Sequence, residues 1–316
     1  MNNKIKKVLH KFQISEKDFE IIKKKSKISG EFNEDSFEDW FENRFATNLI
    51  ILTKKEYTQM CVNALRILPD VAKTDFGMSR QRDMGQIWAD ITRGYLGELA
   101  FLKFLQKHWA IKAELGHKKG SIKKYLPMDI HKVCMLGEKP REPKIKISVK
   151  TTKWNGIWLD IPGDQFSHSN VYILVKIGIE TDHLFSFFKE ISVFKDKVLK
   201  AGEDVGSLSK AESKRIYDDV PPFKEVTAYI CGFALERAKY SVLPYSGKKG
   251  TKNYNITGWK GPISTGDLEK IKKREKIAGN VKFEGIGNFS HDSGFLFSTG
   301  NLLWSRKDWD KVISKL

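Results

Sequence analysis

Two short stretches of the chain carry side chains that could act on a phosphate ester. In residues 125–130 (YLPMDI), one carboxylate, that of Asp129, stands at the end of a short apolar run. In residues 145–152 (IKISVKTT), apolar and polar residues alternate as in a strand, which delivers Lys150. A carboxylate is a hard oxygen ligand for a divalent cation, and a lysine can stabilise a pentavalent phosphate or orient a water molecule. The pair indicates hydrolysis of a phosphodiester.

The spacing of the two stretches resembles the motif of the PD-(D/E)xK nuclease superfamily, which is best known from type II restriction endonucleases. Pro127-Met128-Asp129 stands for the first half of that motif, with one residue inserted between Pro and Asp. Ser148-Val149-Lys150 stands for the second half, with Ser where the family usually has Asp or Glu. The resemblance covers roughly residues 90–200. It implies a restriction-endonuclease-like core that cleaves double-stranded DNA with Mg²⁺.

The resemblance also implies a role for each residue of the motif. Asp129 is the expected first ligand of Mg²⁺, and the backbone carbonyl of Val149 is a further ligand. Lys150 lies on the same strand face as Ser148 and would contact the attacking water or the scissile phosphate.

Ser148 is the main departure from the family pattern, because a neutral hydroxyl cannot replace a charged ligand. Some relatives with Ser at this position recruit a Glu from elsewhere, and Glu98, inside an apolar helical segment, is the best candidate by pattern. The alternative is a Glu on a helix surface with no role. Asp160 and Asp164 are reserve ligands, since related enzymes sometimes draw a carboxylate from just after the lysine.

The elements that would position these residues follow from the apolar periodicity. Residues 90–108 show the clearest helical pattern, and residues 171–179 form an apolar run that predicts a strand covered on both faces. The stretches around Asp129 and Lys150 are expected to be strands joined by a hairpin loop. We expect an irregular segment over 155–164, a short helix or turn over 165–170 and one or two strands over 183–194. This order predicts an α/β fold with a mixed central β-sheet flanked by helices.

The flanking segments are predicted to be helical on the N-terminal side. Residues 31–45 place aromatic side chains at helical spacing, and residues 54–68 predict a helix that ends before Pro69. The lysines at 23–25 are either a DNA-contacting arm or the solvated face of a helical cap.

Beyond residue 200 the pattern changes, and we divide the chain there. We expect a strand over 226–233, a helix capped by Ser264 or Thr265, and a tail docked by Trp304 and Trp309. The predicted division is a helical region (1–85), a catalytic core (86–200) and a basic, aromatic region (201–316) for DNA recognition, dimerisation or both.

The formal charge of +17 points to a polyanionic partner. The alternative is a simple lysine bias with many solvated side chains, but the charge is clustered. Residues 117–153 hold eleven Lys or Arg against three acidic residues, so the basic excess surrounds the two stretches described above. Nucleic acid is the commonest such partner, and double-stranded DNA is the one we expect.

Two polar segments are candidates for reading DNA bases. Residues 74–82 are either a loop that reaches the substrate or a connector, and residues 247–282 hold ten Lys or Arg with interleaved aromatic residues. A solvated helix beside a structural Trp is the competing interpretation of the second segment. The candidate DNA-binding residues are Arg80, Gln81, Arg82, Lys248, Lys249, Lys252, Asn253, Tyr254, Trp259 and Lys260.

Several classes of protein are excluded by what the sequence lacks. Its three cysteines lack the spacing of a zinc site or of a disulfide framework, and no apolar run reaches the length of a membrane span. The sequence has no Walker A motif, the motif that would indicate a nucleotide cofactor. The expectation is a cytoplasmic, homodimeric type II restriction endonuclease. The alternatives are a repair or structure-specific nuclease and a non-catalytic DNA-binding protein with a nuclease-like sheet.

Overall fold

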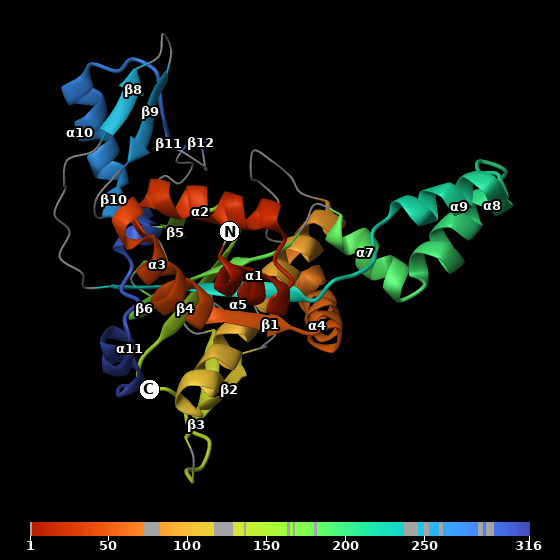
Figure 1. The fold of residues 1–316 in the computed structure, drawn as a ribbon, viewed down its shortest axis with the longest axis horizontal. Coiled ribbons are helices and arrows are strands. Elements are labelled where there is room, and N and C mark those ends of the chain that lie inside the picture. Colours follow the sequence, from red (N-terminus) through yellow and green to blue (C-terminus); the bar gives the residue numbers. More distant parts are fainter. Residues whose placement is uncertain are drawn as a thin grey trace.

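The computed structural model describes most of the chain. The described residues are 2–72, 83–116, 129–135, 137–162, 165–166, 168–179, 182–236, 246–249, 253–258, 262–283, 287–288 and 294–316. They form an α/β fold in which a mixed sheet is flanked by helices (Figure 1).

The central sheet has four strands in the order β1-β7-β6-β4. They are β1 (Leu49–Leu52), β7 (Val226–Leu235), β6 (Val171–Ile177) and β4 (Ile147–Lys153). β4 and β6 are parallel, whereas β7 is antiparallel to both β6 and β1. The sheet therefore takes β1 from the N-terminal segment and β7 from the segment after residue 200.

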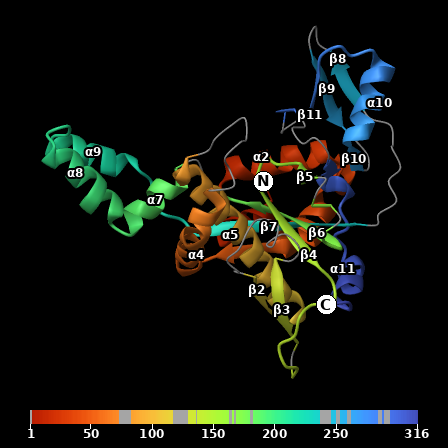
Figure 2. The same cartoon turned by 180° about the vertical axis from the view of Figure 1, so that it is seen from behind.

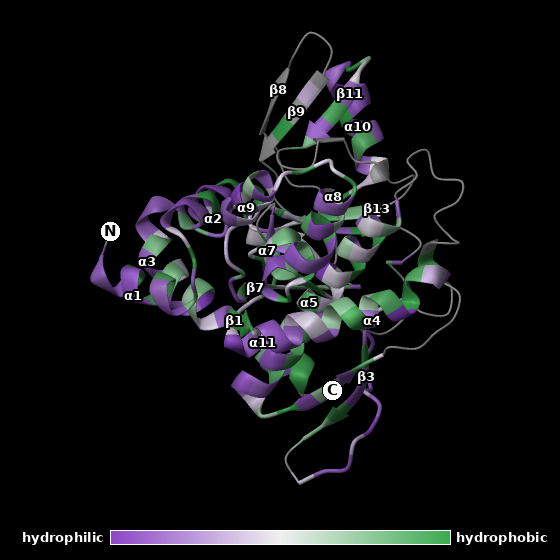
Figure 3. Ribbon diagram, turned by 90° about the vertical axis from the view of Figure 1, so that its right-hand side faces the viewer, coloured by the Kyte–Doolittle hydropathy of each residue, from purple (hydrophilic) through white to green (hydrophobic). Residues whose placement is uncertain are grey.

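Helix α5 (Met84–Trp109) covers one face of this sheet. Its N-terminus is capped by Asp83, whose carboxylate accepts the Gln86 N–H at 2.9 Å, and its apolar stripe includes Leu96, Phe101 and Phe104. Helices α4 (Lys54–Ala72) and α11 (Arg306–Ile313) pack beside it, and Trp309 of α11 is buried in the same core. In Figure 3 the ribbon of α4 and α5 carries green, hydrophobic stretches, whereas that of α1 and α2 is mostly purple and hydrophilic.

The other face is covered by N-terminal helices with an aromatic interior. These are α1 (Asn3–Lys11), α2 (Glu16–Ser29), α3 (Phe37–Asp39), the π-helix η2 (Trp40–Phe45) and the short 3₁₀ turns η1 (Glu34–Ser36) and η3 (Ala46–Asn48). The rings of Trp40 and Phe45 stack with centroids 5.1 Å apart, and Phe45 meets Tyr229 of β7 edge to face at 5.1 Å. The aromatic face predicted from residues 31–45 is confirmed.

A buried ion pair joins these helices to the sheet. Lys176 Nζ of β6 lies 3.1 Å from Glu31 Oε1, and both side chains are fully buried. Glu31 Oε2 accepts hydrogen bonds from Trp40 Nε1 and Tyr229 OH, each at 3.0 Å. Burial alone would raise the pKa of the Glu31 carboxyl, but the charges of Lys176 and Arg44 outweigh it and hold that pKa far below its ordinary value.

Three smaller sheets surround the core. A hairpin pairs β2 (Lys112–Leu115) with β3 (Ile130–Cys134), and a three-stranded sheet has the order β10 (Pro262–Ser264), β13 (Gly294–Ser298), β5 (Trp158–Pro162). The third has the order β12 (Gly287–Asn288), β11 (Asn280–Phe283), β9 (Asn253–Gly258), β8 (Ser246–Lys249). It forms a C-terminal lobe with α10 (Thr265–Glu275), drawn in blue in Figure 1. A 3₁₀ turn, η5 (Thr299–Asn301), leads from β13 toward α11.

Four helical segments form an arm that projects from the body. They are α7 (His183–Glu190), the π-helix η4 (Phe194–Leu199), α8 (Lys200–Asp204) and α9 (Lys210–Asp219). Both Figure 1 and its reverse view, Figure 2, show α8 and α9 at the far end of the arm, away from the central sheet.

Several predicted elements are confirmed. The helix over 90–108 is α5, the apolar run from 171 is β6, and the strand over 226–233 is β7. β6 is buried along its whole length, as expected of a strand covered on both faces. Ser264 caps α10 by accepting the Asp267 N–H.

Four predicted elements are wrong. Residues 183–190 are helical instead of extended, residues 158–162 form β5 instead of an irregular segment, and α4 continues through Pro69 to Ala72. The expected hairpin between the two motif stretches is also absent from the described residues, because β3 pairs with β2, while β4 pairs with β6. Asp129 itself, one residue before β3, is the point at which this chain segment meets β4.

Candidate active site

Asp129 lies against the outer edge of β4. Its backbone N–H donates to the Ile147 carbonyl at 3.0 Å, and its carboxylate Oδ2 accepts the Val149 N–H at 2.5 Å. The carboxylate thus accepts the hydrogen bond that a backbone carbonyl of a neighbouring strand would otherwise accept, at the point where backbone pairing with β4 ends. Since the N–H and C=O of one strand residue point to the same side, the Val149 carbonyl is directed to the same edge.

Glu98 reaches the site from α5. A Cβ atom at Gly97 would lie 1.9 Å from Thr151 Oγ1, so only glycine allows α5 to approach β4 this closely. The Thr151 hydroxyl donates to the Gly94 carbonyl at 3.4 Å and joins the same turn of the helix to the strand. This contact places the turn of α5 that carries Glu98 directly beside β4. The side chains of Thr151 and Lys150 point to opposite faces of the strand, and Glu98 and Lys150 act on each other through their charges.

The charged side chains of the site act on one another. Burial raises the pKa of Glu98 well above its ordinary value, the Asp129 carboxylate raises it further, and the Lys150 ammonium opposes both effects. Burial also raises the pKa of Asp129. Hydrogen bonds from the Val149 N–H and the Ser148 side chain, together with the charge of Lys150, lower it in part. Two neighbouring carboxyl groups disfavour each other's ionisation, and a bound cation would relieve this repulsion.

Lys150 is held by a residue that the sequence does not single out. Its Nζ donates a hydrogen bond to Gln165 Oε1 at 2.7 Å. The backbone of Gln165 is fixed in turn, because Tyr172 OH of β6 donates to the Gln165 carbonyl at 2.7 Å and the ring of Phe166 stacks on Tyr172 with centroids 5.6 Å apart. Tyr172 is the partner of Ser148 in the β4–β6 register, so the whole unit belongs to two adjacent strands.

The structure brings together five of the predicted site residues. Glu98, Asp129, Ser148 and Lys150 interact directly or through their charges, and Val149 donates its N–H to Asp129. Asp160 lies on β5, whose neighbour in the sheet is β13, so it belongs to a different sheet from Lys150. Asp164 falls outside the described residues.

The predicted DNA-binding residues are mostly beyond what the structure describes. Arg80, Gln81, Arg82, Lys252, Trp259 and Lys260 lie outside the described residues. Lys248 and Lys249 are on β8 and Asn253 begins β9, in the C-terminal lobe. Tyr254, in contrast, is buried in the apolar core of that lobe, so its ring packs inside the lobe and is not available to stack on a base.

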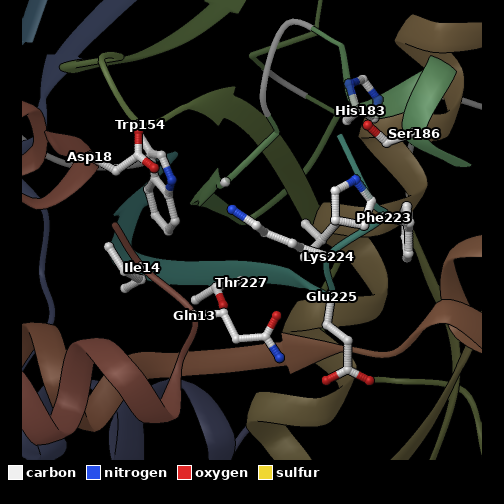
Figure 4. A pocket seen from close by; sticks show the side chains of 13 residues that line it. Gln13, Ile14, Asp18, Trp154, His183, Ser186, Phe223, Lys224, Glu225 and Thr227 are labelled. Atoms are coloured by element: carbon white, nitrogen blue, oxygen red, sulfur yellow. The ribbon is translucent and has the colours of Figure 1, made fainter. Parts of the chain in front are cut away.

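A small pocket lies at the ends of β4 and β6, apart from the carboxylates. It is lined by Trp154, Gly178, His183 and Lys224, among others, and holds a volume of about 40 Å³. Figure 4 shows the Lys224 side chain extending across it toward Trp154. A volume of this size suits one or two water molecules, so the pocket does not add a substrate site.

The donor set of Glu98 and Asp129 fits a hard divalent cation. Mg²⁺ is commonly bound by one or two carboxylates, with waters and phosphate oxygens completing its shell. Among the residues that the structure describes, no three His, Cys, Asp or Glu side chains cluster as a metal-binding group, and the site offers these two carboxylates with the Val149 carbonyl.

Comparison with known proteins gives no assignment. The chain matches no protein-family model, no curated protein and no solved structure. Across the part of the chain that the structure describes, no helix is both long and apolar enough to cross a bilayer.

Proposed function

We propose that this chain is a Mg²⁺-dependent endonuclease of the type II restriction kind, with a PD-(D/E)xK-like site that cleaves double-stranded DNA. One observation carries the proposal. Glu98 on a helix and Asp129 at a strand edge are both buried with a raised pKa; the Asp129 carboxylate adds to the rise at Glu98, and the charge of Lys150 lowers the pKa of both groups. This is the grouping of charges that phosphodiester hydrolysis requires.

Glu98, Asp129 and the Val149 carbonyl would hold the cation. When bound, Mg²⁺ supplies positive charge on the phosphate and a more acidic water. The protein contributes the positions: the Val149 N–H and the Ser148 side chain orient the Asp129 carboxylate, and Gly97 fixes the distance of Glu98 from the strand. Ser148 therefore acts as a hydrogen-bond donor that orients Asp129, where the family usually has a charged ligand.

Lys150 is the residue proposed to face the reacting phosphate. In the reaction, the water oxygen forms a bond to phosphorus, the bond between phosphorus and the leaving oxygen breaks, and a proton ends on the leaving hydroxyl. The three N–H donors of Lys150 can orient the water or stabilise the charge on the phosphate oxygens. Its hydrogen bond to Gln165 keeps the ammonium near the carboxylates before DNA arrives.

The net charge supports DNA as the substrate. A chain of +17 attracts polyanions without regard to sequence, and α10 of the C-terminal lobe carries Lys270, Lys272, Lys273 and Arg274 in its second half.

Cleavage of a sequenced plasmid tests the proposal. Wild-type protein with Mg²⁺ should give discrete fragments, and EDTA should abolish them. Asp129→Ala and Lys150→Ala should each lower the rate on the order of 100-fold or more while DNA binding persists. Full activity in either variant rejects the site. Nicks confined to junctions or mismatches would assign a repair nuclease, and DNA binding without cleavage would assign a non-catalytic binder.

A further inference from the structure

A groove lies between α11 and the region where β6 begins and β7 ends. It holds a volume of about 600 Å³, within the range of about 300–1,000 Å³ that is typical of sites for small organic ligands. Neither Glu98 nor Asp129 is among the described residues that line it, so the groove is separate from the candidate active site. Its apolar lining consists of Ile145, Val171, Phe233, Leu235, Leu303 and Val312.

Leu303 is held rigidly in the wall of this groove. Its N–H donates to the Phe233 carbonyl and its carbonyl accepts the Phe233 N–H, each at 2.9 Å. The close crossing depends on Gly232, which has a φ of +135° and at which a Cβ atom would lie 2.5 Å from the Leu303 carbonyl oxygen. Although its backbone is fixed in this way, Leu303 remains 39% exposed. The groove therefore offers an apolar ligand a preformed contact.

Three lysines give one end of the groove a positive charge. Lys311 lies on α11, and Lys315 follows it by one helical turn just beyond the end of that helix. Lys144 joins them, because its backbone N–H donates to the Leu316 carbonyl at 3.3 Å. All three lysines are exposed, and none of them forms an ion pair with another residue that the structure describes. Their ammonium groups are available to a ligand.

The two carboxylates of the lining are already engaged within the protein. Asp308, in the first turn of α11, accepts hydrogen bonds from the Ser305 N–H at 3.3 Å and from the Ser305 hydroxyl at 2.6 Å. The Glu236 carboxylate accepts a hydrogen bond from the Asn170 side-chain amide at 3.3 Å. The groove thus favours a ligand with an anionic head, which the lysines would bind through charge-assisted hydrogen bonds.

We propose that this groove binds a small organic acid with an apolar alkyl or aryl body. The carboxylate of the ligand meets Lys144, Lys311 and Lys315, and its body covers Leu303 and the apolar lining. A DNA duplex can reach such lysines through its phosphates, but its charged backbone offers no apolar chain to cover Leu303. The combination of an apolar wall and a basic end therefore favours the organic acid. The proposal concerns binding and does not depend on the proposed nuclease activity.

Titration with three matched ligands tests the proposal. Decanoate joins an apolar chain to a carboxylate, decanol keeps the chain without the charge, and acetate keeps the charge without the chain. In isothermal titration calorimetry, decanoate should saturate one site with a dissociation constant of about 100 µM or lower. Decanol should bind at least about 10-fold more weakly, and acetate should show no saturable binding.

Variants of the groove locate the site. Lys311→Gln/Lys315→Gln should weaken decanoate binding about 5-fold or more and leave decanol binding unchanged, whereas Leu303→Ser should weaken the binding of both ligands. Lys195→Gln/Lys197→Gln is the matched control, because it removes the same charge from exposed positions of η4, and it should bind decanoate as wild type does. Because all the substituted residues are exposed, circular dichroism should be unchanged.

The absence of saturable decanoate binding at millimolar concentration overturns the proposal, and so does an equal affinity in the groove and η4 variants. If a short DNA duplex displaces decanoate while Leu303→Ser keeps the wild-type affinity, the three lysines belong to a DNA surface, which overturns it as well. Since the readout is the heat of binding a small ligand, loss of this site and loss of DNA cleavage are scored separately.

Discussion

Lys150 Nζ and Gln165 Oε1 are 2.7 Å apart, which ties the lysine of the candidate site to a turn that Tyr172 holds in place. An amide oxygen accepts one of the three N–H donors of the ammonium and leaves the other two for a phosphate or a water. Gln165 is therefore a positioning residue in the proposed reaction.

Replacing Gln165 should slow cleavage without weakening DNA binding. Gln165→Ala removes the acceptor, and the freed lysine samples positions away from the carboxylates. We expect a fall of about 10- to 100-fold in the single-turnover rate, the range for residues that orient a reactive group. Gln106→Ala, at an exposed position of α5, is the control and should keep the wild-type rate. Equal rates for the two variants would show that the hydrogen bond has no part in the reaction.

Glu98→Gln should separate stability from activity. The pKa values of Glu98 and Asp129 are raised in the folded protein, so these groups favour folding below the ordinary carboxyl pKa and lose that contribution as the pH rises toward the folded values. A neutral amide at position 98 removes this loss. Without metal, the variant should resist urea better than wild type at about pH 8 and similarly at about pH 4, while it cleaves no DNA.

Added Mg²⁺ provides the second half of that experiment. The cation should stabilise wild type in proportion to its occupancy and should stabilise the Glu98→Gln variant much less. The acid limb of the wild-type cleavage profile should move to lower pH as the Mg²⁺ concentration rises, because protons and metal compete for the same two carboxylates. A limb that does not move with Mg²⁺ would remove Glu98 and Asp129 as ligands.

Lys176→Met should be among the most destabilising substitutions in the chain. It leaves the buried Glu31 carboxylate without its partner at 3.1 Å, and removing one member of a buried pair costs about 3–5 kcal/mol. The free energy of unfolding, measured with urea, should fall by that amount. Lys200→Met breaks an exposed pair with Asp204 and should leave the urea midpoint unchanged. Similar midpoints for the two variants would mean that the buried pair contributes no net stability.

Lysines on α10 should contribute to DNA affinity without contributing to sequence choice. Lys270→Ala/Lys273→Ala removes two exposed charges from the C-terminal lobe. Binding should weaken by a similar factor on every duplex. The slope of log affinity against log salt should fall by about one for each DNA phosphate that the variant no longer neutralises.

A variant of the arm is the control for the α10 lysines. Lys195→Ala/Lys197→Ala removes the same charge from exposed positions of η4. Residues 183–219 of the arm contain seven Lys or Arg and seven Asp or Glu, so the arm has no net charge to attract DNA. This variant should therefore bind DNA as wild type does. An equal loss of affinity in the two variants would place DNA on the arm as well.

The site was predictable where a local pattern dictates structure. The helical period of residues 90–108 predicts α5, which carries Glu98. The apolar run from residue 171 predicts β6, which supports the strand of Lys150. Gln165 gave no such signal, because a neutral amide in a turn gains its role only from the lysine that folding brings to it.

Two other features depend on partners that are distant in the chain. β5 is a strand because β13, more than a hundred residues later, pairs with it, whereas Pro162 and the neighbouring glycines suggest a loop. Lys176 looks like the polar end of an apolar strand, and only Glu31 from the N-terminal helices explains how its charge is buried. The helix of residues 183–190 could have been predicted, since Leu184, Phe187 and Phe188 recur at the i, i+3, i+4 spacing of one helix face.

The strand order of the central sheet has a consequence for synthesis of the protein. β6 lies between β4 and β7, so a ribosome that has finished Ile177 has made a strand that is buried along its whole length in the folded protein, but it must continue through Leu235 before the second neighbour of that strand is complete. During that interval the edge of β6 that will pair with β7 is free, although α5 and the N-terminal helices that cover the two faces of the sheet have already been made. Until β7 emerges, this edge can pair with the strand of another nascent chain.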